Sequence, residues 1–421
     1  MRGGARGRAL DVQSVRFARG RRAPPRIRIF SNGCISGWSE GTARIRVMPR
    51  LRVGVIFGGR SGEHEVSLAS AASVIAALEQ RGHHVVPIGI SRDGRWAVGG
   101  DPMHALAEQA RVALPSGDDT GAVKKALADR AEGVLSAESS ALVRSEPAGS
   151  VPSELRLGLD VVFIALHGPY GEDGTIQGLL ELADVPYVGA GVLASAVGMD
   201  KITMKTVFAA HGLPIVEHLV VMRHEWRVRP AAVAARIAER LGFPCFVKPS
   251  NLGSSVGITK VKSASELGDA LASAARYDRK LIVERGLRAR EIEVSVLGND
   301  SPEASLPGEI VYEGEWYDYA TKYAEGQMRL VCPAPVGPEL IARFRELAIA
   351  AFRAIDCSGM ARVDFFLDDT GAILVNEINT IPGFTSTSGY AKMWEATGLS
   401  YPDVVQRLVD LALERHRDTS R

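Results

Sequence analysis

Polar side chains interrupt two neighbouring apolar segments near the end of the chain. The segment ILVNEIN carries Glu377 and Asn379 two residues apart, and the preceding segment GMARVDFFL carries Arg362 and Asp364 at the same spacing. Both segments otherwise predict buried strands. Because side chains alternate between the two faces of a strand, each pair lies on one face. The pattern indicates chemistry at this face and not a plain core.

The connector between these segments, DDTG, contains a tight-turn signal. A hairpin that turns about its Thr-Gly pair places Asp364 opposite Glu377 and Arg362 opposite Asn379. Opposed carboxylates repel unless a cation lies between them. Two carboxylates with an amide oxygen form the hard-oxygen set that suits Mg²⁺. The sequence therefore predicts a metal site at Asp364, Glu377 and Asn379. The alternative is an exposed edge hairpin with incidental acids.

A second motif, VKPSNLGSSVG, places Lys248 at a strand end before a loop that contains Ser254 and Ser255. Backbone N–H groups and hydroxyls in such a loop can cradle phosphate oxygens. A hairpin tip without a ligand is the alternative. The G-x-S-x-G of serine hydrolases is also present, but a strand follows it, and the only later histidine, His416, lies in a charged tail. These two features argue against a hydrolase.

A third motif, GGRSGEHEVS, follows the apolar strand at 51–57. Its glycines resemble a dinucleotide-binding turn, but the G-x-G-x-x-G order and a later acidic strand end are missing. Glu63 or Glu65 near the start of the next helix could simply complement the helix dipole. Alternating strands and helices through the first half predict an α/β fold, and the polar segment 100–156 reads as an insertion.

Composition limits the remaining classes. The chain has 421 residues, 46% of them hydrophobic and 24% charged, which predicts two or three globular domains. No run of about 18 apolar residues predicts a membrane span. The four cysteines form no CxxC pair, so we expect free thiols of a cytosolic protein and no zinc site.

The first fifty residues differ from the rest of the chain. They hold twelve Arg and only two acids, Asp11 and Glu40, whereas the net charge of the whole chain is +1. An Arg-rich arm can bind nucleic acid or serve as an organelle transit peptide. A disordered tail or an over-extended start of translation before Met48 is the alternative that we favour.

Taken together, these motifs closely resemble the D-alanine–D-alanine ligase family of the ATP-grasp superfamily. The matching stretches occur in family order between residues 51 and 400: VIFGGRSGEHEVSLAS, ALHGPYGEDGTIQGLLE, VGMDKITMK, VKPSNLGSSVGITKV, IVERGLRAREIEVSVLG, WYDYATKY, ARVDFFL and NEINTIPGFTSTS. The series is far more specific than any one member.

The resemblance implies a role for each matching position. The positions that match ATP contacts are Lys201, Lys248, Ser254, Ser255, Glu284, Leu287, Glu291 and Lys322. Those that match metal ligands are again Asp364, Glu377 and Asn379. Those that match catalytic residues are Glu63, Ser254, Tyr323, Arg362 and the backbone of Gly383. Those that match substrate contacts are His167 for the first D-alanine and Ser388 for the second.

The resemblance also implies an α/β, three-domain ATP-grasp ligase whose N-terminal domain is a doubly wound parallel sheet, with ATP held between two α+β domains. We expect a basic extension at 1–49, an N-terminal domain at 50–190, a central domain at 191–288 and a C-terminal domain at 289–421. The implied cofactors are ATP and two Mg²⁺ or Mn²⁺ ions. The implied partners are D-alanine and a second copy in a homodimer, in the cytoplasm, without nucleic acid or membrane.

The expected reaction joins two D-alanines through an acylphosphate, with a D-alanine–D-lactate or other carboxylate–amine ligase as the alternative. Tyr323 favours D-alanine, because family members that use D-lactate replace this tyrosine, often by histidine, and tyrosine is uncharged near neutral pH. The alternative is that Tyr323 only packs. Arg285, Gly286 and Gly389 depart from the common family pattern, and Gly389 predicts a looser acceptor pocket.

Overall fold

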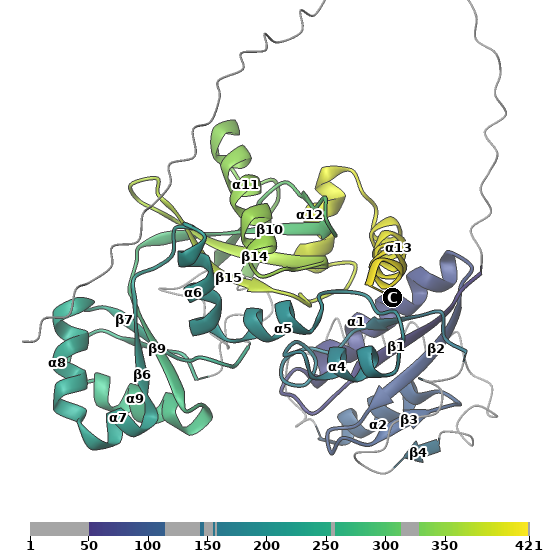
Figure 1. Ribbon diagram of the computed structural model, residues 1–421, viewed down its shortest axis with the longest axis horizontal. Helices are drawn as coiled ribbons and strands as arrows, with labels where there is room; N and C mark the ends of the chain where they lie inside the picture. The colour runs from purple at the N-terminus through teal and green to yellow at the C-terminus, as the bar shows by residue number, and fades with distance from the viewer. Residues whose placement is uncertain are drawn as a thin grey trace, which may run out of the picture. The chain divides into compact units, whose positions relative to one another are not determined.

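The computed structural model describes residues 50–113, 144–146, 155, 158–253, 257–312 and 328–419. All of them belong to Pro49–Arg421, one of the two units into which the chain divides. Three β-sheets with flanking helices make up this unit (Figure 1).

The first sheet has the strand order β4-β3-β2-β1-β5. Its strands are β1 (Arg52–Gly58), β2 (His84–Ile90), β3 (Trp96–Val98), β4 (Arg144–Glu146) and β5 (Val161–Ile164). β1 pairs in parallel with β2 and β5, as predicted for a doubly wound sheet, while β3 and β4 add an antiparallel edge. β4 and helix α2 (Pro102–Ala113) lie in the predicted insertion, so part of that segment completes the sheet. Helix α1 (His64–Gln80) follows β1 and buries its apolar residues.

The second sheet is antiparallel, with the order β6-β9-β7-β8. Its strands are β6 (His218–Met222), β7 (Cys245–Pro249), β8 (Thr259–Val261) and β9 (Lys280–Arg285). Helices α7 (Arg223–Val228), α8 (Pro230–Arg240) and α9 (Leu267–Tyr277) accompany it (Figure 1). Val233 and Ile237, one turn apart on α8, are fully buried and share a core with the strands.

The third sheet is antiparallel, with the order β13-β12-β10-β14-β15 and β11 paired to β10. Its strands are β10 (Ala289–Gly298), β11 (Glu303–Ala304), β12 (Gly308–Tyr312), β13 (Met328–Val331), β14 (Gly359–Asp368) and β15 (Ile373–Asn379). Helix α11 (Pro338–Ala354) packs on it through Phe344 and Phe352.

The remaining helices are α4 (Thr175–Leu182), α5 (Val192–Met199), α6 (Lys201–Ala210), α12 (Gly389–Thr397) and α13 (Tyr401–Thr419).

Each hydrophobic core combines elements that are distant from one another in the sequence. Met204 and Phe208 of α6 join the core of the third sheet, whereas Trp394 of α12 and Leu408 of α13 join the core of the first. Helices thus link sheets that are distant in sequence.

The β14–β15 hairpin has the predicted residue pairs at its acidic end, but its turn differs from the predicted one. Asp364 lies opposite Glu377 and Arg362 opposite Asn379, as predicted. Closer to the turn, however, the register is shifted by one residue, and Asn376 is the extra residue of a β-bulge. The predicted two-residue turn is wrong, because the Asp368 carboxylate accepts hydrogen bonds from the backbone of residues 370 and 372 and widens the turn. The bulge then restores the register at the acidic pair.

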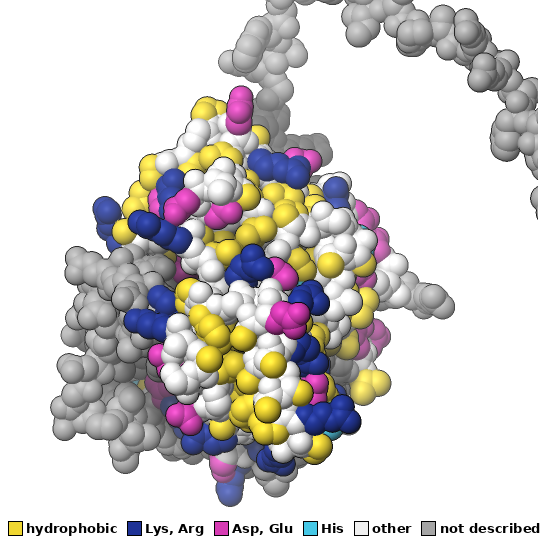
Figure 2. Space-filling model, turned by 90° about the vertical axis from the view of Figure 1, so that its left-hand side faces the viewer, with side chains coloured by type: hydrophobic (Ala, Val, Ile, Leu, Met, Phe, Trp, Pro, Cys, Tyr) yellow, Lys and Arg dark blue, Asp and Glu magenta, His cyan; other side chains and the backbone are white. Residues whose placement is uncertain are grey.

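The surface and the thiols fit the composition. Figure 2 shows charges of both signs interspersed with apolar side chains on one face. Within the described residues, no helix is long and apolar enough to span a membrane. Cys245, Cys332 and Cys357 are free thiols, as expected, whereas Cys34 lies outside the described residues.

Candidate active site

A pocket of about 1010 Å³ gathers most of the predicted site residues. Thirteen predicted residues line it: Glu63, His167, Lys201, Lys248, Glu284, Leu287, Glu291, Arg362, Asp364, Glu377, Asn379, Gly383 and Ser388. These residues come from segments spread over more than 300 positions. The other four, Ser254, Ser255, Lys322 and Tyr323, lie outside the described residues.

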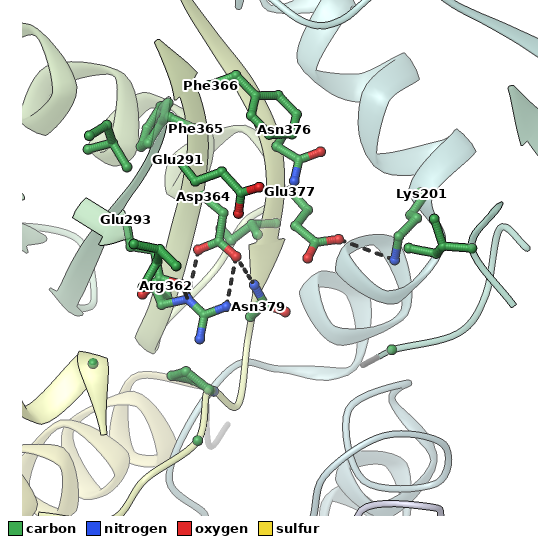
Figure 3. A pocket seen from close by; sticks show the side chains of 18 of the residues that line it. Lys201, Glu291, Glu293, Arg362, Asp364, Phe365, Phe366, Asn376, Glu377 and Asn379 are labelled. Carbon is green, nitrogen blue, oxygen red and sulfur yellow. Dashed lines mark hydrogen bonds and ion pairs between the residues drawn. The ribbon is translucent and has the colours of Figure 1, made fainter. Parts of the chain in front are cut away.

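The predicted metal ligands lie on one face of the β14–β15 hairpin (Figure 3). Arg362 donates from Nε and Nη2 to the two carboxylate oxygens of Asp364, each at 2.7 Å, and Asn379 Nδ2 donates to Asp364 Oδ2 at 2.9 Å. Lys201 Nζ lies 3.2 Å from Glu377 Oε2. The nearby carboxylates, that of Asp364 foremost among the charges, outweigh burial and raise the pKa of Arg362 well above its usual value.

This donor set fits a divalent cation that is shared with a ligand. The described residues include no group of three or more His, Cys, Asp or Glu that could hold a metal ion by itself. The hairpin instead offers two opposed carboxylates, with Asn379 able to add its amide oxygen. Mg²⁺ commonly takes one or two protein carboxylates and completes its shell with phosphates and water. The carboxylates of Asp364 and Glu377 can therefore hold such an ion once phosphate is present.

A buried charge cluster forms another wall of the pocket. Glu284 is the last residue but one of β9 and is 2% exposed. Its Oε2 accepts a hydrogen bond from Lys248 Nζ at 2.5 Å, and its Oε1 lies 3.0 Å from Lys205 Nζ. Burial opposes the charged carboxylate, but the two ammonium groups outweigh it and hold the pKa of Glu284 well below its usual value. Glu284 is therefore an ionised acceptor at neutral pH.

Glu63 and His167, the predicted contacts of the first substrate, lie near Glu172, which was not predicted. His167 is 3% exposed, and its Nδ1 lies 3.1 Å from the Ile381 carbonyl oxygen and 3.6 Å from Glu172 Oε1. Its Nε2 shares a hydrogen bond of 2.9 Å with Ser70 Oγ. Burial alone would lower the pKa of His167, but Glu172, with Glu63 and the Ile381 carbonyl, outweighs it and raises that pKa. Glu63 and Glu172 both line the pocket here.

Glycines let the backbone approach the Glu63 carboxylate. Gly168 has a φ of +74°, and a Cβ there would lie 3.0 Å from Glu63 Oε2. A Cβ on Gly253 would lie 3.4 Å from the same atom. The start of the glycine-serine loop therefore reaches the Glu63 side of the pocket, where Ser254 is predicted to act.

The predicted acceptor end lies at the start of α12. Ser388 is the residue before the helix, and its Oγ accepts a hydrogen bond from the Thr385 backbone N–H at 2.9 Å. Gly383 is close enough that a Cβ there would lie 3.6 Å from Ser388 Oγ. At Gly389 a Cβ would lie 3.0 Å from Glu293 Oε2. The carboxylate of Glu293 thus limits the room that Gly389 was predicted to open.

Sequence reasoning missed several charged residues of this region, Glu172, Glu293 and Lys205 among them. Glu172 and Glu293 line the pocket, and Lys205 lies behind Glu284. Each carried a usable signal. Lys205 is one helical turn after Lys201, Glu293 shares a strand face with Glu291, and Glu172 follows His167 by five residues in a glycine-rich loop.

Comparisons with known proteins agree with this arrangement. The family described as D-ala D-ala ligase N-terminus matches residues 52–190, and the one described as D-ala D-ala ligase C-terminus matches residues 207–410. A D-alanine–D-alanine ligase of Heliobacterium modesticaldum is 50% identical over 89% of this chain and 98% of its own length. One of Geobacillus thermodenitrificans is 45% identical over 88% of this chain and 97% of its own length.

Solved structures give the same result. The D-alanine-D-alanine ligase from Coxiella burnetii has a TM-score of 0.71 and 36% identity, over 88% of this chain and 95% of that one. The VanG D-Ala:D-Ser ligase from Enterococcus faecalis has a TM-score of 0.70 and 32% identity, over 86% of this chain and all of that one. The chain therefore belongs to the D-alanine–D-alanine ligase family.

Proposed function

We propose that this protein joins two molecules of D-alanine to D-alanyl-D-alanine for peptidoglycan precursor synthesis, using ATP and Mg²⁺ or Mn²⁺ and forming ADP and phosphate. The observation that carries the proposal is that one pocket of about 1010 Å³ contains opposed carboxylates, two lysines that can bind phosphate, and an arginine. These residues are Asp364, Glu377, Lys201, Lys248 and Arg362. That volume suits a nucleotide together with a small substrate. The family membership and the names of the relatives support the same reaction.

The first step activates a carboxylate. A free carboxylate does not react with an amine, because it is anionic and has no leaving group. Transfer of the γ-phosphoryl of ATP to the first D-alanine forms an acylphosphate and releases ADP. Lys201 and Lys248 stabilise the phosphate charges, and the residues that hold the nucleoside are Glu284, Leu287 and Glu291. Two divalent cations held by Asp364, Glu377 and Asn379 would neutralise further charge on the phosphates.

The second step forms the peptide bond. The amine of the second D-alanine attacks the acyl carbon, phosphate leaves, and the nitrogen loses its proton. The oxyanion that forms is stabilised by Arg362 and the Gly383 N–H, because donors placed where charge develops lower the barrier. Glu63 and His167 hold the first D-alanine, and Ser388 holds the carboxylate of the second.

Closure of the site completes the proposal. An acylphosphate hydrolyses in water, so the pocket must exclude solvent during the reaction. We assign this role to the glycine-serine loop with Ser254 and Ser255 and to the segment GEWYDYATKYAEGQ with Lys322 and Tyr323. Ser254 and Tyr323 would join Glu63 when these segments close.

The acceptor is the main alternative to test. D-lactate or another acceptor would need only a changed second subsite, and VanG, named as a D-Ala:D-Ser ligase, is similar to this chain. The names of the curated relatives at 45–50% identity favour D-alanine. The test is phosphate release from ATP with a panel of D- and L-amino acids and D-hydroxy acids. A competition between D-alanine and D-lactate at pH 6 and pH 8 follows, and a dominant D-lactate product at pH 6 would refute the assignment.

We place the enzyme in the cytoplasm as a homodimer, with domains at 50–190, 191–288 and 289–421 and a dispensable arm before them. A nucleic-acid-binding role of the arm is the other class of function. Removing the arm and assaying both ligation and nucleic-acid binding distinguishes the two.

A further inference from the structure

Lys205 is a buried cation that the proposed chemistry leaves without a role. It is 1% exposed on α6, and it is not among the residues that line the pocket. Its Nζ lies 3.0 Å from Glu284 Oε1 and donates a hydrogen bond of 2.9 Å to the Asn376 carbonyl oxygen. A buried charge is costly unless it is paired, and these two contacts supply that pairing.

The Asn376 contact fixes the position of this ammonium group. Asn376 is the extra residue of the β15 bulge, so its carbonyl group lies outside the regular ladder. Lys205 and Lys201 are four residues apart and lie on one face of α6. Lys201 reaches Glu377 while Lys205 reaches Asn376 and Glu284. One helix therefore connects the hairpin to the wall that carries Glu284.

Glu284 keeps capacity for a further hydrogen bond. An ionised carboxylate has about four acceptor positions and no donor. Lys248 donates to Oε2, and Lys205 Nζ lies 3.0 Å from Oε1, so each oxygen has one cationic neighbour and retains further acceptor capacity. A buried acceptor that lines a pocket is best satisfied by a donor on the ligand.

The charges around Glu284 keep it an acceptor. Burial lowers the pKa of Lys205, with Lys248 adding to this effect and Glu284 opposing it. Burial also acts against the charge of Lys248, but Glu284 outweighs it and raises the pKa of Lys248. Without the ammonium group of Lys205, one buried carboxylate oxygen would lose its compensating charge, and protonation of Glu284 would become easier.

We propose that Lys205 is a positioning residue that makes the nucleotide site selective for a base with an exocyclic amino group, by holding Glu284 as a fixed, ionised acceptor. Adenine presents such a group at its 6-position. Hypoxanthine presents an oxygen there, which an ionised carboxylate repels. The inference rests on the proposed use of ATP, and it assigns the base selectivity to a residue outside the pocket wall.

The test compares the binding of ADP and IDP, which differ at this 6-position, by calorimetry. We expect the wild-type protein to prefer ADP, and Lys205→Met to reduce that preference by about tenfold or more, since a charge-assisted hydrogen bond is at stake. Lys205→Arg keeps the charge and should keep most of the preference. The same comparison with ATP and ITP in the ligation assay should change kcat/KM for ATP more than for ITP.

A control removes another ion pair near the same sheet, one that is more exposed than the Lys205–Glu284 pair. Arg236 donates to Glu225 at 2.8 Å, and neither residue lines the pocket. Arg236→Met should leave the preference for ADP unchanged. If Lys205→Met does not fold, Lys205→Gln, which keeps a donor without the charge, is measured in the same way.

Two results would overturn the inference: no preference for ADP in the wild-type protein, or an unchanged preference in the uncharged Lys205 variant. A loss of affinity for both nucleotides in equal proportion would count as the second result, because it indicates a purely structural role. The binding measurement does not depend on ligation. A wild-type protein that binds ADP selectively but forms no D-alanyl-D-alanine would contradict the proposed function and leave this inference intact.

Discussion

Arg362→Lys keeps the positive charge and should nevertheless cost most of the activity. Arg362 holds both oxygens of Asp364 with Nε and Nη2, and Nη1 takes part in neither bond. The guanidinium group can therefore hold Asp364 and still present a donor to the oxyanion. Lysine has one compact ammonium group and cannot do both from this position.

The magnitude follows from the lost donor. Removal of one donor to a developing oxyanion typically costs about 3–4 kcal/mol, or on the order of 10²–10³ in kcat. Because Arg362 acts on the transition state and not on the nucleoside, the KM for ATP should change only a few-fold.

Arg290→Lys is the matched control. Arg290 makes the same two-pronged pair on the same sheet, with Nε and Nη2 each 2.7 Å from an oxygen of Glu309, and neither residue lines the pocket. Because the Arg290 side chain is 42% exposed and that of Arg362 is 17% exposed, the control should lose less stability, and it should lose little activity. The assay is coupled ADP release with D-alanine, alongside thermal unfolding of both variants. Near-normal kcat in Arg362→Lys, or equal losses of kcat in the two variants, would make Arg362 a structural residue and refute the reasoning.

Three further predictions concern other parts of the chain. Glu377→Ala should abolish turnover while Glu377→Asp leaves some, because alanine removes an oxygen ligand opposite Asp364; an Mg²⁺ titration with unchanged dependence in the alanine variant would contradict the metal site. Glu172→Gln should lower the pKa of His167 in an NMR titration, because Glu172 helps to raise it. Protonated His167 contributes stability that is present below its unperturbed pKa of 6.5 and is lost as the pH rises through its folded pKa, so in the variant this contribution should end at a lower pH; an unmoved pKa would refute the assignment. The chain begun at Met48 should retain full ligation activity, and a folded but inactive product would show that the arm is needed.

The acidic hairpin could be predicted from sequence, because its information is local. Alternation of apolar and polar residues defines the strand faces, and the pairing of Asp364 with Glu377 follows once the two strands meet. The route to that pairing could not be read from the sequence. The Asp368 side chain widened the turn, and the bulge at Asn376 compensated, since a one-residue slip would have turned the acids to the opposite face.

The sequence alone also identified thirteen of the residues that line the pocket, through the resemblance of its motifs to a family. It could not show that Lys205 lies between Glu284 and Asn376, which are 79 and 171 positions further along the chain. Nor could it show that His167 contacts the Ile381 carbonyl oxygen, 214 positions away. Such contacts depend on how α6 packs against the third sheet and how α12 and α13 pack against the first. Packing of this kind depends on the shape and burial of side chains over the whole unit. The spacing of residues within a motif shows only which of them share a face of one strand or helix.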